Sequence, residues 1–342
     1  MGNLNIAVVG AGLIGRNHIG LVRQAGACTL CAIVDPDVQA KNIANEYDVR
    51  YFEDLQSLLQ AKIADGIILA TPNSLHYEQA IACIDAGVPV LIEKPVTETV
   101  AQAEKLVGKV KQLHAKVIVG HHRMHSAIMQ RAHETIGSGA IGDIVAVQGS
   151  ALFYKPDAYY AAGPWRSKKG GGPILINMIH EIGNLRYLCG EIDSVQAMPS
   201  NARRRFEVED TVAILLRFTS GAVGTFILSD TAASCRSWEQ TARENPDYHH
   251  DAEEDCYHIA GTLGSLSVPT MTLHRFESKA QASWYQPMQV SRNPVEVVDP
   301  LERQLAHFCT VINGDATPLV SVEDGYKNLL ITEQIARACG SF

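Results

Sequence analysis

The sequence lacks the features that mark nucleic-acid-binding, membrane and secreted proteins. It has no long basic run, and its 29 basic and 37 acidic residues leave a net charge of −8. Nucleic acid is therefore not an expected partner, because domains that bind it usually carry a basic patch. The longest apolar runs are far shorter than the about 20 residues that a membrane-spanning helix needs, so we expect no membrane association. The start, Met1-Gly2-Asn3, leads straight into an apolar strand, unlike a secretory signal peptide.

Metal-binding patterns are also scarce. Only Cys28 and Cys31 among the eight cysteines stand close together, and a zinc site needs further ligands that this spacing does not supply. Thiols at the start of an apolar strand usually pack as small hydrophobic groups. His121, His122 and His125 resemble metal ligands superficially, but no carboxylate or cysteine stands beside them. The sequence therefore predicts no metal site, and the scattered cysteines favour a reducing, cytoplasmic environment.

The first part of the chain alternates strands with helices. Its apolar runs are rich in valine and isoleucine, as strands buried on both faces should be. They cover residues 4–9, 30–34, 67–70, 88–92 and 117–119, with helical stretches at 14–25, 38–47, 75–86 and 99–114. The alternation predicts an α/β domain of the Rossmann type, with a doubly wound parallel sheet, over residues 1–121.

After residue 121 strands follow one another without helices between them. This part begins with a helix over 127–136, an extended run over 144–153 and a helix over 174–188. Strands are then expected at 194–198, 211–218, 222–228, 256–260 and 265–268. The chain ends with helices over 300–313 and 322–338. This order predicts a second, α+β domain with a mostly antiparallel open sheet over residues 122–342. We expect this domain to bind substrate and to form oligomers.

A glycine-rich turn follows the first strand and opens the first helix. In the run Gly10-Ala11-Gly12-Leu13-Ile14-Gly15, Gly10 permits a tight turn, Gly12 lets the backbone approach a pyrophosphate, and Gly15 lets the helix pack on the strand. The helix start at Leu13 and Ile14 would face the phosphates with unpaired N–H groups. In this context the motif predicts a dinucleotide site rather than only a glycine-rich turn.

The end of the second strand indicates which dinucleotide is bound. Asp35 lies about 20 residues past the last glycine, where an acidic residue accepts hydrogen bonds from the adenosine ribose. Its carboxylate would repel a 2′-phosphate, and Pro36 supplies no compensating cation. NAD is therefore predicted in preference to NADP. A helix-capping role for Asp35 is the alternative, and it is compatible with ribose binding.

Two further strand ends are candidates for the cofactor pocket. Thr71, Pro72 and Asn73 follow the strand at 67–70, with His76 entering the next helix; packing or capping is the alternative role of His76. The run Glu93-Lys94-Pro95 follows the strand at 88–92. Ligands of an open parallel sheet bind at this edge, so Glu93 and Lys94 are predicted near the cofactor, and Lys94 is predicted near the nicotinamide.

A helix in the second domain carries a polar stripe. Asn177, His180 and Asn184 recur at helical spacing among apolar residues, directly after the glycine triplet that ends at Gly172. Such a stripe indicates a lined cleft, in which Asn177 would bond the imidazole or a substrate. A buried histidine with a structural role is the alternative.

Taken in order, these motifs resemble the Gfo/Idh/MocA oxidoreductases. The resemblance rests on the GxGxxG turn, on Ala70-Thr71-Pro72 with His76, on Glu93-Lys94-Pro95, and on the glycine triplet before His180. It implies that Lys94 and His180 carry catalysis on a secondary hydroxyl group of a sugar, a cyclitol or a hydroxylated cyclic acid. It also implies a homodimer or homotetramer packed through the second domain's sheet.

The sequence departs from this family at two positions near the histidine. Family members often have an aspartate four residues before it and another three residues after it, where this chain has Ile176 and Gly183. Isoleucine cannot orient an imidazole, so either Lys94 or His180 can be the base. A dehydrogenase for cyclic cis-diols and a non-catalytic NAD-binding sensor are the alternatives to a polyol dehydrogenase.

Two surfaces complete the expectations. Trp165 would form an apolar wall against a substrate ring, with Arg166 or Lys168 reaching a polar or anionic substituent; a solvated surface loop is the alternative.

The second sheet has helices for one face only. Its other face would expose alternating apolar residues, either Val212, Ile214 and Leu216 or their neighbours one position on, and an uncovered face of this kind usually marks an interface.

Overall fold

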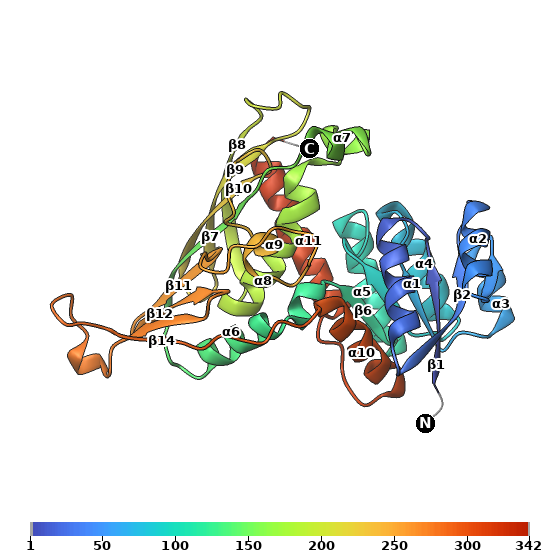
Figure 1. Cartoon of the computed structure of the whole chain (residues 1–342), viewed down its shortest axis with the longest axis horizontal. Helices are drawn as coiled ribbons and strands as arrows, with labels where there is room; N and C mark the ends of the chain where they lie inside the picture. Colours follow the sequence, from blue (N-terminus) through green and yellow to red (C-terminus); the bar gives the residue numbers. More distant parts are fainter. Residues whose placement is uncertain (1–2, 341–342) are drawn as a thin grey trace. The chain divides into compact units, whose positions relative to one another are not determined.

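The computed structural model describes residues 3–340 and divides into two compact units (Figure 1). The first unit contains the chain up to His125 and again Pro300–Leu329. The second contains Ser126–Asp299 and the chain from Leu330 onward.

A parallel sheet of six strands forms the centre of the first unit. Its strands are β1 (Leu4–Val9), β2 (Cys28–Val34), β3 (Arg50–Phe52), β4 (Gly66–Leu69), β5 (Val90–Glu93) and β6 (Val117–Gly120). They lie in the order β3-β2-β1-β4-β5-β6. The order reverses between β1 and β4, and such a reversal opens a crevice at the carboxyl ends of the strands. The predicted doubly wound sheet is confirmed.

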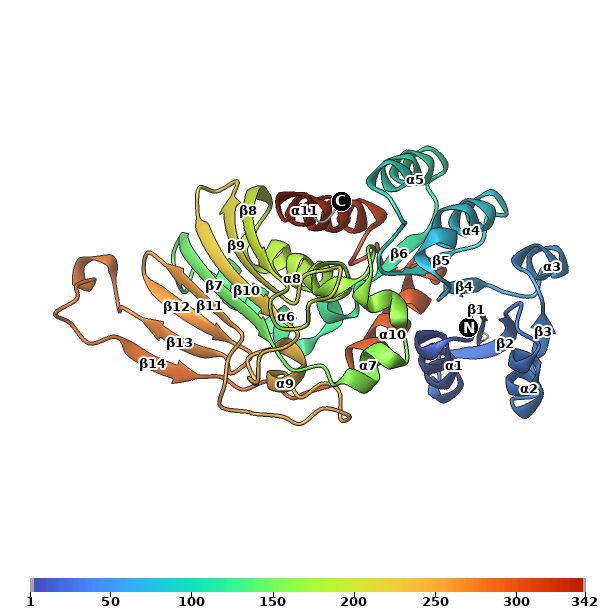
Figure 2. The same ribbon diagram turned by 90° about the horizontal axis from the view of Figure 1, so that it is seen from above.

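Helices cover both faces of this sheet. They are α1 (Leu13–Gln24), α2 (Gln39–Glu46), α3 (Leu55–Ala61), α4 (Asn73–Asp85), α5 (Val100–Leu113) and α10 (Pro300–Asn313), with a short 3₁₀ turn, η1 (His122–His125). One core cluster joins the sheet to α1, α2 and α10, and α3, α4 and α5 lie on the opposite face (Figure 2).

Helix α10 comes from the far end of the chain. Phe308 of α10 is fully buried. A Cβ on Gly66 of β4 would lie 2.5 Å from Ile312 Cδ1 and 3.1 Å from Phe308 Cζ, so any side chain there would have to displace the packed Ile312 side chain. The division of the sequence at residue 121 gives this helix to the second domain, whereas the structure packs it on the first sheet.

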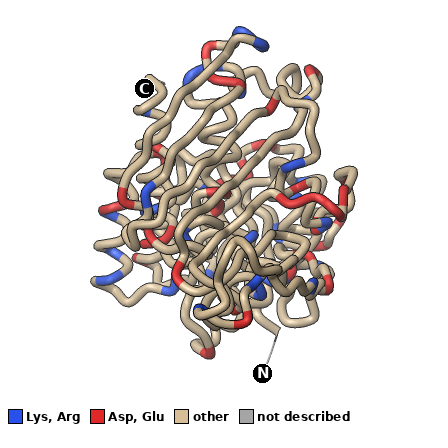
Figure 3. The backbone as a smooth tube through the Cα atoms, turned by 90° about the vertical axis from the view of Figure 1, so that its left-hand side faces the viewer, with Lys and Arg blue, Asp and Glu red and all other residues tan. Residues whose placement is uncertain are grey.

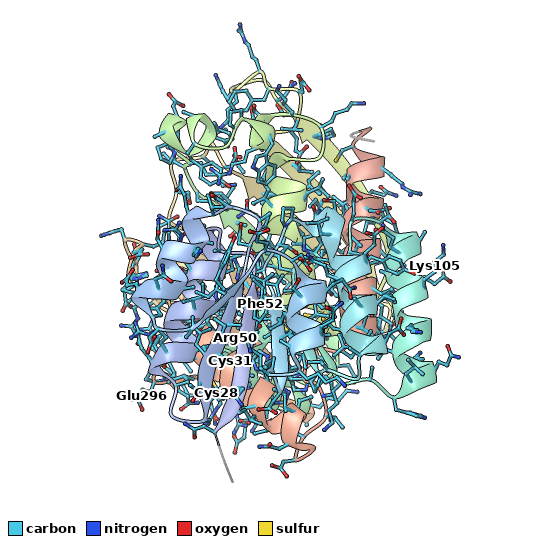
Figure 4. The ribbon with its side chains drawn as sticks, turned by 90° about the vertical axis from the view of Figure 1, so that its right-hand side faces the viewer. Cys28, Cys31, Arg50, Phe52, Lys105 and Glu296 are labelled. Atoms are coloured by element: carbon cyan, nitrogen blue, oxygen red, sulfur yellow. The ribbon has the colours of Figure 1, made fainter. Side chains whose placement is uncertain are left out.

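The two closely spaced cysteines belong to β2. Figure 4 labels Cys28 and Cys31 on β2 and Arg50 on β3, which pairs with β2. Cys28 is buried, and the neighbouring thiol of Cys309 on α10, together with burial, raises its pKa. All eight cysteines are free thiols.

The second unit is built on an eight-stranded sheet. Its strands are β7 (Ile144–Leu152), β8 (Ile192–Ser200), β9 (Thr211–Phe218), β10 (Val223–Ser229), β11 (Tyr257–Gly261), β12 (Gly264–Val268), β13 (Thr272–Arg275) and β14 (Gln289–Arg292). They lie in the order β14-β13-β12-β11-β7-β10-β9-β8. Only β7 and β10 pair in parallel, so the predicted mostly antiparallel sheet is confirmed.

The remaining elements are mostly short. They are α6 (Ala127–Gly137), α7 (Asp157–Ala161), η2 (Pro164–Ser167), η3 (Ile174–Met178), α8 (Ile179–Cys189), α9 (Trp238–Thr241), η4 (Lys279–Gln281) and α11 (Val322–Ala338). Helices α6 and α8 lie on one side of the eight-stranded sheet, and Figure 3 views its other side. Val212, Ile214 and Leu216 are buried, whereas Leu215 is 54% exposed. The apolar residues on the uncovered face are therefore the neighbours of that triplet.

One predicted helix is divided in two. Residues 174–188 were expected to form a single α-helix, but η3 is a π-helical turn that leads into α8. A π-turn rotates the side chains before it relative to those after it. Residues 174–178 therefore do not continue the stripe predicted from regular α-helical spacing.

Candidate active site

The glycine-rich turn joins β1 to α1, and its three glycines lie in different surroundings. A Cβ on Gly10, whose φ is +95°, would lie 2.5 Å from the Ala70 carbonyl oxygen, and a Cβ on Gly15 would lie 2.0 Å from that of Gly10. Around Gly12 nothing lies within 4 Å of such an atom. Gly12 gives no side-chain cap to α1. The turn thus leaves space and unpaired N–H groups where a pyrophosphate would bind.

Asp35 stands at the end of β2 beside this turn. Its Oδ2 accepts a hydrogen bond from the Ala11 N–H (2.7 Å), and its Oδ1 accepts one from the Asp37 N–H (2.8 Å). Each carboxylate oxygen has room for a second bond. The carboxylate is therefore fixed next to the glycine turn and still able to accept ribose hydroxyl groups. The ribose contact itself stays a prediction.

His76 contacts the two segments that follow β4 and β5, the other two strand ends predicted for the cofactor pocket. Its Nε2 lies 2.9 Å from the Thr71 carbonyl oxygen, and its Nδ1 lies 2.8 Å from the Pro95 carbonyl oxygen. The imidazole is buried, and burial lowers its pKa against the opposing effect of these two carbonyl groups. Both ring nitrogens are thus occupied, so His76 would act on a cofactor only through the turns that it holds. Pro72 and Asn73, at the start of α4, are exposed.

Glu93 is the last residue of β5, and its carboxylate is buried. Oε1 lies 2.8 Å from His18 Nε2 on α1, and Oε2 accepts a hydrogen bond from the Lys94 N–H (3.2 Å). Burial alone would raise the pKa of Glu93, but the hydrogen bond from His18 and the nearby His18, His122 and Lys94 lower it below its usual range. Direct contact between Glu93 and a cofactor stays a prediction.

Lys94 follows β5 and is half-buried; the Lys94–Pro95 peptide bond is cis. In the first unit the structure brings the ends of β1, β2, β4 and β5 to one edge of the sheet. The predicted cofactor residues lie at this edge, namely Gly10, Gly12, Leu13, Ile14, Gly15, Asp35, Thr71, Pro72, Asn73, His76, Glu93 and Lys94. The edge has the donors and the open backbone that a dinucleotide needs.

In the second unit His180 lies in the first turn of α8 and is 8% exposed. The helical segment before it is anchored by Glu209, whose Oε1 accepts a hydrogen bond from the Ile174 N–H (2.9 Å). Burial raises the pKa of Glu209. Gly172, with a φ of +82°, packs against that carboxylate, since a Cβ there would lie 2.7 Å from Oε1. The glycine triplet therefore lets the loop close over Glu209.

The polar stripe on this helix is not a single surface. Asn177 Oδ1 accepts a hydrogen bond from Lys155 Nζ at 2.6 Å, whereas Asn184 is fully buried and its Nδ2 donates to the Tyr257 hydroxyl at 2.7 Å. Sequence reasoning missed Lys155, because a single lysine after a strand forms no motif. Its side chain is 12% exposed, with Nζ 3.9 Å from Asp230 Oδ2.

Trp165 and Arg166 lie in η2. Trp165 is 56% exposed, as a side chain available to a ligand would be. The Arg166 guanidinium stacks on the Tyr159 ring at 4.0 Å and donates to the Tyr159 carbonyl oxygen. Arg166 is thus held against its own loop. Substrate contacts of Trp165, Arg166, Asn177 and His180 stay predictions.

The part of the chain that the structure describes, residues 3–340, holds no group of three or more histidine, cysteine, aspartate or glutamate side chains able to bind a metal ion. None of its helices is both long and apolar enough to cross a membrane.

The chain is similar to known proteins over almost its whole length. A 1,5-anhydro-D-fructose reductase from Ensifer adhaerens is 25% identical over 98% of this chain and 96% of its own length. A scyllo-inositol 2-dehydrogenase (NAD(+)) from Bacillus subtilis is 28% identical over 94% of this chain and 90% of its own. The crystal structure of the WlbA dehydrogenase from Bordetella pertussis has the same fold, with a TM-score of 0.77 at 24% identity over 99% of this chain and 97% of that one.

The family match covers both units. Residues 4–121 match the family described as "Oxidoreductase family, NAD-binding Rossmann fold", and residues 129–267 match the "GFO/IDH/MocA C-terminal domain". The glycine turn, Asp35 and Lys94 fall within the first match, and His180 falls within the second. With its NAD-binding domain and its open sheet domain both matched, the chain belongs to the Gfo/Idh/MocA family of oxidoreductases.

Proposed function

We propose that the protein is an NAD-dependent dehydrogenase for a secondary hydroxyl group of a sugar, a cyclitol or a hydroxylated cyclic acid. The observation that carries this proposal is the position of Lys94. It stands at the carboxyl end of β5, on the same sheet edge as the glycine turn and Asp35. The names of two relatives, 1,5-anhydro-D-fructose reductase and scyllo-inositol 2-dehydrogenase, support this substrate class.

The first unit would hold the cofactor. Backbone N–H groups at Gly12 and the start of α1 would bind the pyrophosphate, and Asp35 would accept the ribose hydroxyl groups. Bound NAD supplies the carbon that accepts the hydride. The open space at Gly12 and the fixed carboxylate of Asp35 fit this ligand.

Alcohol oxidation also needs a group that takes the hydroxyl proton. Lys94 would hold the reacting oxygen of the substrate and stabilise its developing negative charge. His180 would take the proton, since the usual pKa of histidine lies near neutrality. Trp165 and Asn177 would contact the rest of the substrate. Ile176, four residues before this histidine, is half-buried and offers no carboxylate, so His180 would work without the aspartate common in the family.

Lys94→Ala and His180→Ala test these roles. Each should lower kcat by about 10²–10⁴-fold, the usual contribution of an acid–base group, while NAD affinity changes little in His180→Ala. If His180 is the base, the limb of the pH–rate profile that reports it should vanish in His180→Ala; if Lys94 is the base, that limb should persist and mainly KM should rise. The exposed Lys105 and His249 give control variants, Lys105→Ala and His249→Ala, expected to match the wild type. Wild-type kinetics in His180→Ala would remove His180 from the mechanism.

A substrate screen distinguishes this function from its alternatives. Thermal unfolding with NAD plus sugars, inositols, uronates or cyclic cis-diols finds ligands, because binding to the folded state raises its apparent stability. NADH formation is then followed with each ligand found. Turnover of cyclic cis-diols alone would favour a dihydrodiol dehydrogenase, and binding without any turnover would favour a sensor.

A further inference from the structure

The buried pair of His18 and Glu93 adjoins Lys94 but has no part in the chemistry described so far. His18 Nε2 and Glu93 Oε1 are 2.8 Å apart, and the two side chains are 2% and 7% exposed. The second carboxylate oxygen accepts a hydrogen bond from the Lys94 N–H at 3.2 Å. One carboxylate thus joins α1, whose start forms the glycine turn, to the strand end that carries Lys94.

The position of this carboxylate is fixed from the next strand. Gly120 ends β6, and a Cβ there would lie 2.9 Å from both Cδ and Oε1 of Glu93. Any side chain at position 120 would therefore displace the carboxylate from His18. Glycine at this position is explained by close packing, because its backbone conformation is one that other residues can adopt.

Positive and titratable groups surround the carboxylate. His18 comes from α1, His76 from α4, His122 from η1, and Lys94 from the end of β5. An ionised carboxylate can only accept hydrogen bonds, so His18 Nε2 must carry the hydrogen that joins the pair. The charge of Lys94 is among the groups that lower the pKa of Glu93. This interaction is mutual, so the ionised carboxylate favours the charged form of the Lys94 ammonium group.

We infer that His18 and Glu93 are positioning residues: together they fix the place of Lys94, and the carboxylate of Glu93 keeps the ammonium group of Lys94 charged in the free enzyme. The inference rests on the proposed function for the catalytic use of Lys94. It also deepens that function, because a charged lysine can hold and stabilise the substrate oxygen but cannot accept its proton. His180 is then the group left to act as the base.

The charge of Lys94 can be measured without a substrate. Lys94 is acylated with a small amine-reactive reagent over a range of pH, and the modified peptide is quantified by mass spectrometry. Glu93→Gln keeps the shape and the acceptor for His18 but removes the charge, so the pH midpoint of Lys94 acylation should fall by about one unit. Glu78→Gln makes the same exchange at an exposed position of α4 and should leave the midpoint unchanged. A wild-type midpoint in folded Glu93→Gln would overturn the inference.

Variants of His18 provide an independent test. His18 and Lys94 compete for one carboxylate, so His18→Phe, which removes the donor, should raise the acylation midpoint of Lys94. His18→Gln still offers an N–H group and should restore the wild-type value. With a substrate in hand, His18→Phe should lower kcat at least tenfold with little change in NAD affinity, and His18→Gln should recover most of the loss. Equal midpoints in all three proteins would contradict the inference.

Different results would contradict the proposed function and the positioning role of His18 and Glu93. If Lys94→Ala keeps full activity, the proposed chemistry is wrong, while the acylation midpoints still report on the pair. If Lys94→Ala is inactive but neither Glu93→Gln nor His18→Phe moves the midpoint, the chemistry stands and the positioning role is wrong. Far-ultraviolet circular dichroism and thermal unfolding confirm that each variant is folded before it is assayed.

Discussion

Asp35 is fixed beside the glycine turn, and we expect its charge to select the cofactor. Its two oxygens accept hydrogen bonds from Ala11 and Asp37 N–H groups, so its charge is held beside the glycine turn. A cofactor with a 2′-phosphate would bring a second negative charge to this fixed one. The spacing from the glycines was enough to predict the position of Asp35. The bond to Ala11 was not predictable, because it depends on how the turn folds.

Replacing Asp35 should therefore change the cofactor preference. In Asp35→Ser with Pro36→Arg, the ratio of kcat/KM for NADP to that for NAD should rise by about 10–100-fold, since a hydrogen bond to a charged group contributes about 1.5–3 kcal/mol. KM for both cofactors should also rise, because Ala11 loses its acceptor. Initial rates with the two cofactors give the ratio. Asp37→Ser is the control, and an unchanged ratio in the double variant would rule out the ribose contact.

The residues that sequence reasoning missed have partners far away in the chain. His18 meets Glu93 across 75 positions, and Glu209 meets Ile174 across 35. Lys155 meets Asn177 across 22. Each of these side chains stands alone in the sequence, without a repeated spacing or a flanking motif. Lys94 and His180 could be proposed from the sequence because short local motifs surround them, and their catalytic roles stay predictions.

At the scale of elements, the sequence predicted the helices and strands that bury apolar side chains better than the exposed or very short ones. The predicted bounds of β1, β9, α10 and α11 agree with the structure, because each has an apolar periodicity that extends over its whole length. The edge strand β14 is exposed at all four positions and β3 has only three residues, so neither has such a pattern. Both were missed. Pairing with a neighbouring strand, rather than local sequence, defines them.

Periodicity predicted α10 as a helix but could not say which sheet it would cover. The structure packs α10 against η1, with the rings of His307 and His125 5.2 Å apart. Burial, together with the neighbouring His307, His122 and Arg303, lowers the pKa of His125 to about 3. The folded protein therefore excludes a proton that the unfolded chain can take up.

This exclusion makes the first unit sensitive to acid. Below the unfolded pKa of 6.5 the unfolded chain binds a proton at His125 and the folded protein does not, so stability falls as the pH falls from there towards 3. The loss is about 1.4 kcal/mol per pH unit at most. His125→Gln should therefore lose less stability than the wild type between pH 6.5 and 4.5, by roughly 2 kcal/mol. Denaturant unfolding at a series of pH values measures this. His249→Gln, in an exposed loop, should follow the wild type; parallel curves for His125→Gln and the wild type would refute the assignment.

At the scale of the whole molecule, the uncovered face of the eight-stranded sheet is its main unexplained surface. Leu215 of β9 is 54% exposed, Met198 of β8 is 72% exposed and Val223 of β10 is 48% exposed. Two hollows on this face are lined by apolar and uncharged polar side chains, with His258 and Arg217 as the titratable residues among them. An apolar face of this extent, with almost no charge, is typical of a surface that binds another protein.

We expect a second copy of the chain to cover this face in a homodimer, or in a homotetramer built from such dimers. Leu215 pairs with Thr225 on one side and Gln196 on the other, so it lies within the face rather than at its edge. Leu215→Lys would place an ammonium group in the interface, and a buried charge without a partner costs several kcal/mol. In a symmetric dimer both copies carry the substitution, so each would bring an ammonium group to the interface.

Light scattering at micromolar concentration should therefore give a multiple of the 37.2 kDa chain mass for the wild type and the chain mass for Leu215→Lys. Leu113→Lys makes the same exchange at a position that is 46% exposed at the end of α5, a helix of the first unit, and should assemble like the wild type. Both variants should keep their far-ultraviolet circular dichroism, because neither side chain belongs to a core. A monomeric wild type, or an assembled Leu215→Lys protein, would show that this face is not the interface.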